Sequence, residues 1–424
     1  MIQNLVLRLI NENLVVFLCL YFSFFIFAVY ICAIADVNES KCARFINIDI
    51  PVYLEERFLG EAGREKIHRL NQYLSYERNP ILQIVYCAVI FGGWSVMFFY
   101  GYPLIPNVHV GAYHKINGYF VFAACISSWV AVVRRDPGHV TLRTMSRYDN
   151  YSYDGWMFEN RKCPTAGIRK IARSKYDRMS SRHVPRYDHY CGWVNQTIGE
   201  ENYRLFLLFL LIHAGMLWYG TIVTTFIFYS ESERLGLNTA TFYDSKGNLL
   251  KTSRKVGIQY MMQRYTALVS LWVVMFVLAL VLTGFVLFHT YLIYNGMTTN
   301  EFYKWKAVRK WHAQASTKYA LYVEKRAKEN ATTSNQSSKG SGVSQGYLVP
   351  EDVDIGCVGP TLSSKSIPVD ESKIDEPKDP GVLPEDFPYN LGSFRKNLHE
   401  VLFPRCFRER DRDAQETSAF KKHD

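Results

Sequence analysis

The stretch LFLLFLLIHAGMLWYGTIVTTFIFY, residues 205–229, contains no Asp, Glu, Lys or Arg. A helix needs roughly 20 apolar residues to cross the hydrocarbon core of a bilayer, and this stretch meets that length. Similar uncharged runs lie at residues 14–35, 81–100, 116–133 and 266–294. Because only helices and closed barrels satisfy their backbone polar groups in lipid, the sequence predicts an all-α polytopic membrane protein with five transmembrane helices.

Basic residues indicate which side of the membrane each connecting segment occupies. Between Arg134 and Arg204 there are 14 Lys or Arg against 8 Asp or Glu. Short loops with such an excess face the cytosol. Because each span changes the side of the membrane, fixing this loop in the cytosol sets the side of every other segment. The amino-terminal segment with the first transmembrane helix takes 1–35, followed by a cytosolic segment at 36–80, two helices at 81–134 and a cytosolic domain at 135–204. Two further helices at 205–294 surround a lumenal loop at 230–265, and a cytosolic tail takes 295–424.

The tail contains two different kinds of sequence. Residues 331–346 and 361–381, rich in Ser, Pro, Lys and Asp, hold too few apolar side chains to form a core, so we expect a disordered linker. Near 389–404, apolar residues recur at spacings of three and four beside basic ones. This pattern predicts a short amphipathic helix that lies on the membrane or docks on the spans, with a frayed charged tail as the alternative.

Composition narrows the classes of function. A net charge of +10 is typical of proteins that bind nucleic acid or anionic lipid, and also of membrane proteins with basic cytosolic loops. The sequence shows no zinc-finger spacing, no basic recognition helix and no basic sheet that carries aromatic side chains. We therefore expect the lipid bilayer and no nucleic acid as a partner. The Cys residues number nine, an odd count without regular spacing, and predict no disulfide scaffold.

Residues 186–206, RYDHYCGWVNQTIGEENYRLF, hold the candidate active site. Asp188, His189 and Cys191 supply a carboxylate, a base and a thiol, the three parts of an activated nucleophile. An imidazole that takes the proton of a neighbouring thiol leaves a thiolate, which attacks acyl groups. Since an apolar span starts at Leu205, we expect this thiol next to the membrane, within reach of an acyl chain that lies in lipid.

These residues resemble the signature of the DHHC-type protein S-acyltransferases (palmitoyltransferases), here in the variant form DHYC. Other segments are similar to further motifs of that family: Asp136-Pro137-Gly138 to DPG, Lys170 to Lys175 to KPARS, Gly192 to Phe206 to PWxNxxxGxxNxxxF, Thr298-Thr299-Asn300-Glu301 to TTxE, and Asn390 to Pro404 to the carboxy-terminal conserved helix. The extra first span makes the chain look most like the branch found in the endoplasmic reticulum and Golgi of fungi and animals.

The resemblance implies a fold and a location. Residues 135–204 would form a cytosolic DHHC-like cysteine-rich domain between the third and fourth spans. The protein would lie in an endoplasmic reticulum or Golgi membrane with its active site on the cytosolic face.

The resemblance also implies a reaction. A long-chain acyl group would pass from palmitoyl-CoA to Cys191 and then to membrane-proximal Cys thiols of protein substrates. His189 would act as the base and Asp188 would orient it, with Trp193 near the acyl carbonyl and Thr299 near Asp188. Acyl-CoA would be a substrate, and no cofactor is expected.

The cysteine-rich domain of the family binds two structural Zn²⁺ ions, each through three Cys and one His. Here Cys163 keeps the first Cys position. The other ligand positions have changed: Ala166, Asp177, Ser180, His183 and Thr197 stand in place of Cys, and Tyr176 and Tyr190 in place of His. Neither ion keeps four ligands, so we predict no structural zinc, with Asp177 and His183 as a weak metal-binding pair at most. Hydrogen bonds and packing would then have to hold the domain together.

Two other classes of function provide alternatives to an acyltransferase. A catalytically inactive membrane scaffold would use the altered domain to bind client proteins, and it would take no acyl label from palmitoyl-CoA. A transporter or channel is disfavoured, because the sequence has no inverted repeat and no pair of spans broken by Gly or Pro. His213 and His289 lie within the spans, and we interpret them as hydrogen bonders at helix interfaces rather than as catalytic groups.

Overall fold

The computed structural model describes residues 41–50, 53, 57, 60–237, 242–243, 249–250, 254–333 and 377–407. Within these residues the chain is mostly helical. Four of the described helices are long and apolar enough to cross a membrane: Ile81–Leu104, Tyr113–Arg134, Tyr203–Arg234 and Thr266–Tyr294. They coincide with four of the five predicted spans. The predicted span at 14–35 lies outside the described residues.

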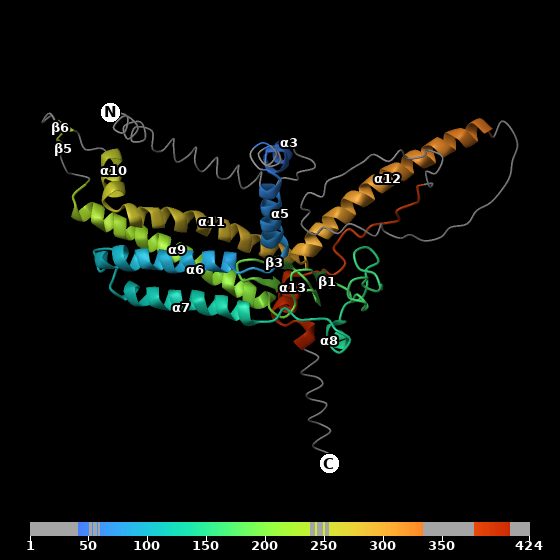
Figure 1. The fold of residues 1–424 in the computed structure, drawn as a ribbon, viewed down its shortest axis with the longest axis horizontal. Helices are drawn as coiled ribbons and strands as arrows, with labels where there is room; N and C mark the ends of the chain where they lie inside the picture. The colour runs from blue at the N-terminus through green and yellow to red at the C-terminus, as the bar shows by residue number, and fades with distance from the viewer. Residues whose placement is uncertain are drawn as a thin grey trace, which may run out of the picture. The chain divides into compact units, whose positions relative to one another are not determined.

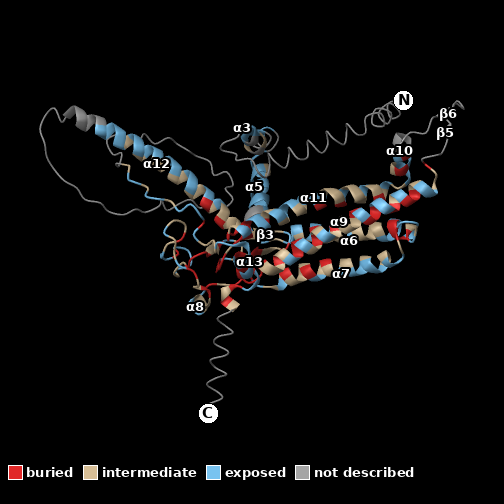
Figure 2. Cartoon of the chain, turned by 180° about the vertical axis from the view of Figure 1, so that it is seen from behind, coloured by how far each residue is buried: buried red, intermediate tan, exposed pale blue. Residues whose placement is uncertain are grey.

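These helices form a bundle, in which they run side by side (Figure 1). They are α6 (Ile81–Val96, continued by η3, Met97–Gly101, and η4, Tyr102–Leu104), α7 (Tyr113–Arg134), α9 (Tyr203–Arg234) and α11 (Thr266–Tyr294). Polar side chains join neighbouring helices, because a hydrogen bond inside lipid has no competition from water. Trp218 of α9 donates to the hydroxyl of Thr283 of α11 at 2.9 Å. Much of the surface of the bundle is exposed in Figure 2, as expected for side chains that face lipid.

The chain divides into two compact units. The first comprises Met1–Asn79, Phe228–Val269 and Gly359–Leu362, and the second comprises Pro80–Ile227, Ser270–Val358 and Ser363–Asp424. The first unit contains α3 (Lys41–Arg44), η2 (Phe45–Asp49), α5 (Glu61–Tyr76), the paired strands β5 (Phe242–Tyr243) and β6 (Leu249–Leu250), and α10 (Arg254–Arg264). The candidate active site lies wholly in the second unit.

The segment between α7 and α9 is built from short strands and loops, apart from the single turn α8 (Met145–Tyr148). Strand β1 (Lys175–Asp177) pairs with β2 (Arg182–Val184), and β3 (His189–Cys191) pairs with β4 (Gln196–Ile198), both antiparallel. The all-α prediction is therefore incomplete here. Strands of three residues are too short to show a period-2 pattern, and their turns use Ser181 and Asn195 at φ values of 53° and 50°.

The chain after α11 returns to the strand-rich domain. Helix α12 (Thr299–Thr333) follows the last span, and residues 377–392 run back along it, with Arg309 donating to the carbonyl of Glu385 at 2.9 Å. Helix α13 (Phe394–Leu402) then falls inside the range expected to be helical. Its Val401 is buried in the same apolar cluster as Phe206 of α9, so this helix docks on the protein.

Candidate active site

The hairpin formed by β3 and β4 puts two of the candidate residues on one face. Alternate residues of a strand point the same way, so His189 and Cys191 lie together while Tyr190 between them faces the other side. The turn of this hairpin is held by Tyr190, whose hydroxyl donates to the side-chain oxygen of Asn195 at 2.5 Å. Local strand geometry therefore brings the base to the thiol.

His189 is hydrogen-bonded to the carboxylate of Asp188 and to the thiol of Cys191, as the sequence suggested. Its Nδ1 donates to Oδ2 of Asp188 at 2.6 Å. Burial alone would lower the pKa of an imidazole, but the hydrogen bonds to Asp188 and to Cys191 outweigh burial and raise the pKa of His189 to about 10. The imidazole in this site is therefore a strong base whose charged form is favoured at neutral pH.

Asp188 is fixed by the start of α12. Its side chain is almost fully buried, and it accepts hydrogen bonds from the backbone N–H of Thr299 at 2.6 Å and from the Thr299 hydroxyl at 2.9 Å. Burial raises the pKa of a carboxyl group, yet the hydrogen bonds from His189 and Thr299 outweigh it, and the pKa of Asp188 lies below its usual value. The carboxylate thus stays charged and holds the imidazole in one orientation.

A buried ion pair connects the start of α12 to the strand-rich domain, the segment between α7 and α9. Arg173 donates from Nε and Nη2 to the two carboxylate oxygens of Glu301 at 2.7 and 2.6 Å, and from Nη2 to the carbonyl of Gly296 at 2.8 Å. The guanidinium lies 4.9 Å from the ring centres of both Tyr151 and Tyr389. This contact could not be predicted from the sequence, because 128 residues separate the two charges.

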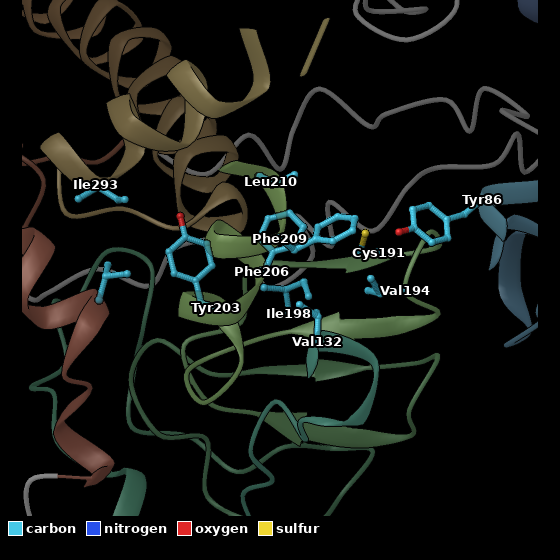
Figure 3. Packing of buried hydrophobic residues seen from close by; sticks show 11 residues of the cluster. Tyr86, Val132, Cys191, Val194, Ile198, Tyr203, Phe206, Phe209, Leu210 and Ile293 are labelled. Carbon is cyan, nitrogen blue, oxygen red and sulfur yellow. The ribbon is translucent and has the colours of Figure 1, made fainter. Parts of the chain in front are cut away.

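Cys191 opens toward the membrane helices. It is buried in an apolar cluster that includes Tyr86 of α6 and Phe206 and Phe209 of α9. Figure 3 shows the sulfur among these aromatic residues, on the side of the hairpin that faces the bundle. The thiol therefore lies in an apolar environment beside the membrane helices.

Three other residues singled out from the sequence lie around this centre. Trp193 is about half exposed, and its carbonyl accepts from Trp129 of α7 at 3.1 Å. His213 contacts the hydroxyl of Tyr86 at 2.9 Å and His289 contacts that of Tyr203 at 2.9 Å. Both histidines join two helices, so the prediction of interface roles is confirmed.

The positions that the resemblance assigns to zinc ligands do not form a tetrahedral donor set. Tyr176 and His183 stand opposite each other across β1 and β2, with ring centres 5.6 Å apart. Asp177, the next residue along β1, points to the other face, so it does not converge with His183. The side chain of His183 is buried, and its Nε2 has no hydrogen-bond partner. In the described part of the chain, no three His, Cys, Asp or Glu side chains are grouped so as to hold a metal. These residues do not fit a zinc site.

The pH dependence of Cys191 reactivity tests the pairing with His189. Because the pKa of His189 is raised to about 10, the imidazolium persists at neutral pH and is lost only as the pH rises through that value. At neutral pH, alkylation of Cys191 by iodoacetamide should therefore be faster in the wild type than in His189→Ala, which has no imidazolium to stabilise a thiolate, and this difference should shrink as the imidazolium is lost near pH 10. Mass spectra of the Cys191 peptide give both rates. A wild type that reacts no faster than the variant at neutral pH contradicts the pairing of His189 with Cys191.

A carboxylate, an imidazole and a thiol in hydrogen-bonded sequence, at the end of a bundle of apolar helices, define a membrane-bound enzyme of the group-transfer class that works through cysteine. Comparison with known proteins gives the family. Residues 157–306 match the DHHC palmitoyltransferase family. The chain belongs to this family.

Several relatives carry palmitoyltransferase in their names. Palmitoyltransferase swf1 of Schizosaccharomyces pombe is 28% identical over 288 residues, which are 67% of this chain and 76% of the relative. Palmitoyltransferase ZDHHC4 of Mus musculus is 31% identical over 250 residues, 58% of this chain and 67% of the relative. Palmitoyltransferase SWF1 of Yarrowia lipolytica is 30% identical over 230 residues, 52% and 57%. Family and relatives support protein palmitoyltransferase activity, and the inactive scaffold has no support among them.

Proposed function

We propose that this protein transfers a long-chain acyl group, palmitoyl above all, from acyl-CoA to cysteine thiols of proteins through an S-acyl intermediate on Cys191. The observation that carries the proposal is the hydrogen-bonded array of Asp188, His189 and Cys191, with the thiol turned toward the apolar helices. Purified protein incubated with radiolabelled palmitoyl-CoA should acquire label that hydroxylamine removes, whereas a scaffold should acquire none.

In the first step His189 takes the proton of Cys191, and the thiolate attacks the carbonyl carbon of the acyl-CoA thioester. The new bond joins the Cys191 sulfur to the acyl carbon. The bond from that carbon to the CoA sulfur then breaks, and the CoA thiolate leaves with the proton that His189 carried. Asp188 remains charged throughout and stabilises the imidazolium.

In the second step a cysteine thiol of a protein substrate attacks the acyl group on Cys191. His189 accepts the proton of the incoming thiol, the acyl group moves to the substrate sulfur, and the pair of Cys191 thiolate and imidazolium is restored. Because the catalytic thiol lies at the end of the membrane helices, substrates should present cysteines close to the bilayer surface.

The apolar surroundings of Cys191 support a long acyl chain as the donor group. Phe206 and Phe209 of α9 and Tyr86 of α6 belong to the same buried cluster as the thiol. Burying a chain of many CH₂ groups among such residues stabilises the complex by about 0.8 kcal/mol per group. Trp193, two residues after the nucleophile, is proposed to lie near the acyl carbonyl.

We also propose the location and topology that the sequence predicted. Five spans would place the strand-rich domain and the tail in the cytosol, in an endoplasmic reticulum or Golgi membrane. The basic surplus between Arg134 and Arg204 and the relatives named swf1 and ZDHHC4 support this proposal. The arrangement puts Cys191 on the side where acyl-CoA is supplied.

Glycosylation tests this topology. N-glycans are added on the lumenal side, and all five native acceptor sites lie in segments proposed to be cytosolic: Asn38, Asn150, Asn195, Asn330 and Asn335. The native chain should therefore carry no N-glycan, and an acceptor site engineered into residues 236–250 should become occupied. Endoglycosidase shifts on gels read the outcome. Occupancy at a native site, or of an engineered site in the tail alone, inverts the orientation.

The last part of the proposal is that the cysteine-rich domain works without structural zinc. The altered ligand positions support it, because the side chains that remain there face different sides of a hairpin and include no converging set of N or S donors. No step of the reaction above requires a metal.

A further inference from the structure

Two hairpins meet on the face of the catalytic strand that points away from the membrane helices. In the first, β1 turns Asp177 to the side opposite His183. In the second, Thr197 of β4 stands directly across from Tyr190 of β3. The side chain of Thr197 therefore lies on the same face of this hairpin as Tyr190, opposite to the face that carries His189 and Cys191.

Asp177 joins these two hairpins by hydrogen bonds. Its Oδ2 accepts from the hydroxyl of Thr197 at 2.6 Å and from the backbone N–H of Ser180 at 2.9 Å. Asp177 is 4% exposed and Thr197 is 2% exposed, so water competes little for these bonds. A buried carboxylate that accepts a short bond from a hydroxyl is among the stronger hydrogen-bonded contacts in proteins. We call the three residues the Asp177 cluster.

We propose that the Asp177 cluster positions the catalytic hairpin, doing with hydrogen bonds what a metal crosslink would do. Asp177, Ser180 and Thr197 are three of the positions at which the resemblance expects zinc ligands. Their side chains are now a carboxylate bonded to a hydroxyl and a backbone amide, which leaves no converging set of soft donors for an ion. The inference deepens the proposed function, because it makes Thr197 and Asp177 positioning residues for the reaction at Cys191.

The Asp177 cluster affects the catalytic residues through the pairing of strands β3 and β4. Thr197 and Tyr190 are cross-strand neighbours, and Tyr190 is the residue between His189 and Cys191. If Thr197 loses its anchor, β4 is free to shift, and β3 shifts with it, which changes the distance from the imidazole to the thiol. Displacements of about 1 Å at reacting groups cost about a hundredfold in rate.

Ser180 provides a matched control within the cluster. It contributes its backbone N–H, and its own hydroxyl is buried with no hydrogen-bond partner. Removal of that hydroxyl should therefore be harmless if the cluster is held by hydrogen bonds. If a metal were bound at these positions instead, Ser180 and Thr197 would both stand at ligand positions, and their side chains would be equivalent.

The experiment compares Thr197→Val, Thr197→Ser and Ser180→Ala in the full-length protein in detergent, at a temperature below all three melting transitions. Thr197→Val keeps the shape but loses the donor, and its rate constant for autoacylation should fall by about tenfold to a hundredfold. The half-saturating concentration of palmitoyl-CoA should not change, because the acyl chain binds on the other face. Thr197→Ser should restore the rate to near that of the wild type, and Ser180→Ala should leave it unchanged.

Zinc analysis and Cys191 alkylation complete the test. The wild type should hold no stoichiometric zinc, and a chelator should leave its melting temperature unchanged. Equal rates in wild type and Thr197→Val, or two zinc ions per chain lost with activity on chelation, overturn the proposal. Should the wild type not autoacylate, the proposed function fails by itself. The cluster is then still judged by iodoacetamide alkylation of Cys191, which Thr197→Val should slow and Ser180→Ala should not.

Discussion

Replacement of Cys191 by Ser should abolish the thioester-linked label that the protein takes from palmitoyl-CoA. The hydroxyl of serine keeps the size of the side chain but does not ionise near neutral pH, so His189 cannot produce a comparable nucleophile. Autoacylation of the purified variant should fall to the background, a loss of at least about a thousandfold, as for other covalent catalysts that lose their nucleophile. Label is measured on the protein band before and after hydroxylamine.

The control for this variant is a second buried cysteine of the same domain. Cys163 is buried and stands where the resemblance expects a zinc ligand, yet it is not part of the hydrogen-bonded array. Cys163→Ser should retain autoacylation. Thioester label that persists in Cys191→Ser would identify a different nucleophile and exclude the mechanism proposed here.

The second large effect concerns the ion pair between Arg173 and Glu301. Both side chains are nearly inaccessible to water, so removal of one partner leaves the other charged and buried. Glu301→Gln and Arg173→Met should each destabilise the protein by about 3–5 kcal/mol. The change is measured as a lowered melting temperature in detergent, and autoacylation should fall too, because the same helix start supplies Thr299 to Asp188.

A double-mutant comparison separates the buried charge from simple loss of packing. The variant that carries both Arg173→Met and Glu301→Gln leaves no charge unpaired, and it should melt above the less stable single variant. Arg69→Met removes an exposed pair with Glu65 and should leave the melting temperature unchanged. Strictly additive losses in the double variant would show that the pair contributes packing alone.

Four of the five predicted spans coincide with described helices, because length and charge decide the outcome there. A run such as 205–229 has no alternative to a membrane helix, because no soluble fold buries so many consecutive apolar side chains. The strands of the catalytic domain could not be predicted in the same way. Each has three residues, and their pairing depends on turns at Ser181 and Asn195 with left-handed backbone conformations.

The residues of the candidate site also divide into those that can be predicted from the sequence and those that cannot. Asp188, His189 and Cys191 could be grouped from the sequence because they lie within four positions: β3 puts His189 and Cys191 on one face, and Asp188 directly precedes this strand. The anchoring of Asp188 by Thr299 was expected from the family resemblance, and the structure supplies the contacts. The bond between Asp177 and Thr197 was not predicted, because it depends on which face of each hairpin a residue occupies, and a shift of one residue in register would reverse it.

The most direct test of the proposed mechanism is to locate the acyl group on the wild-type enzyme. Purified protein is mixed with palmitoyl-CoA, quenched in acid, digested and analysed by tandem mass spectrometry, with a hydroxylamine-treated sample alongside. The array of Asp188, His189 and Cys191 predicts one palmitoyl group, on the peptide that contains Cys191, and its loss in the hydroxylamine sample. A palmitoyl group on Cys163 or Cys406, with the Cys191 peptide unmodified, would contradict it.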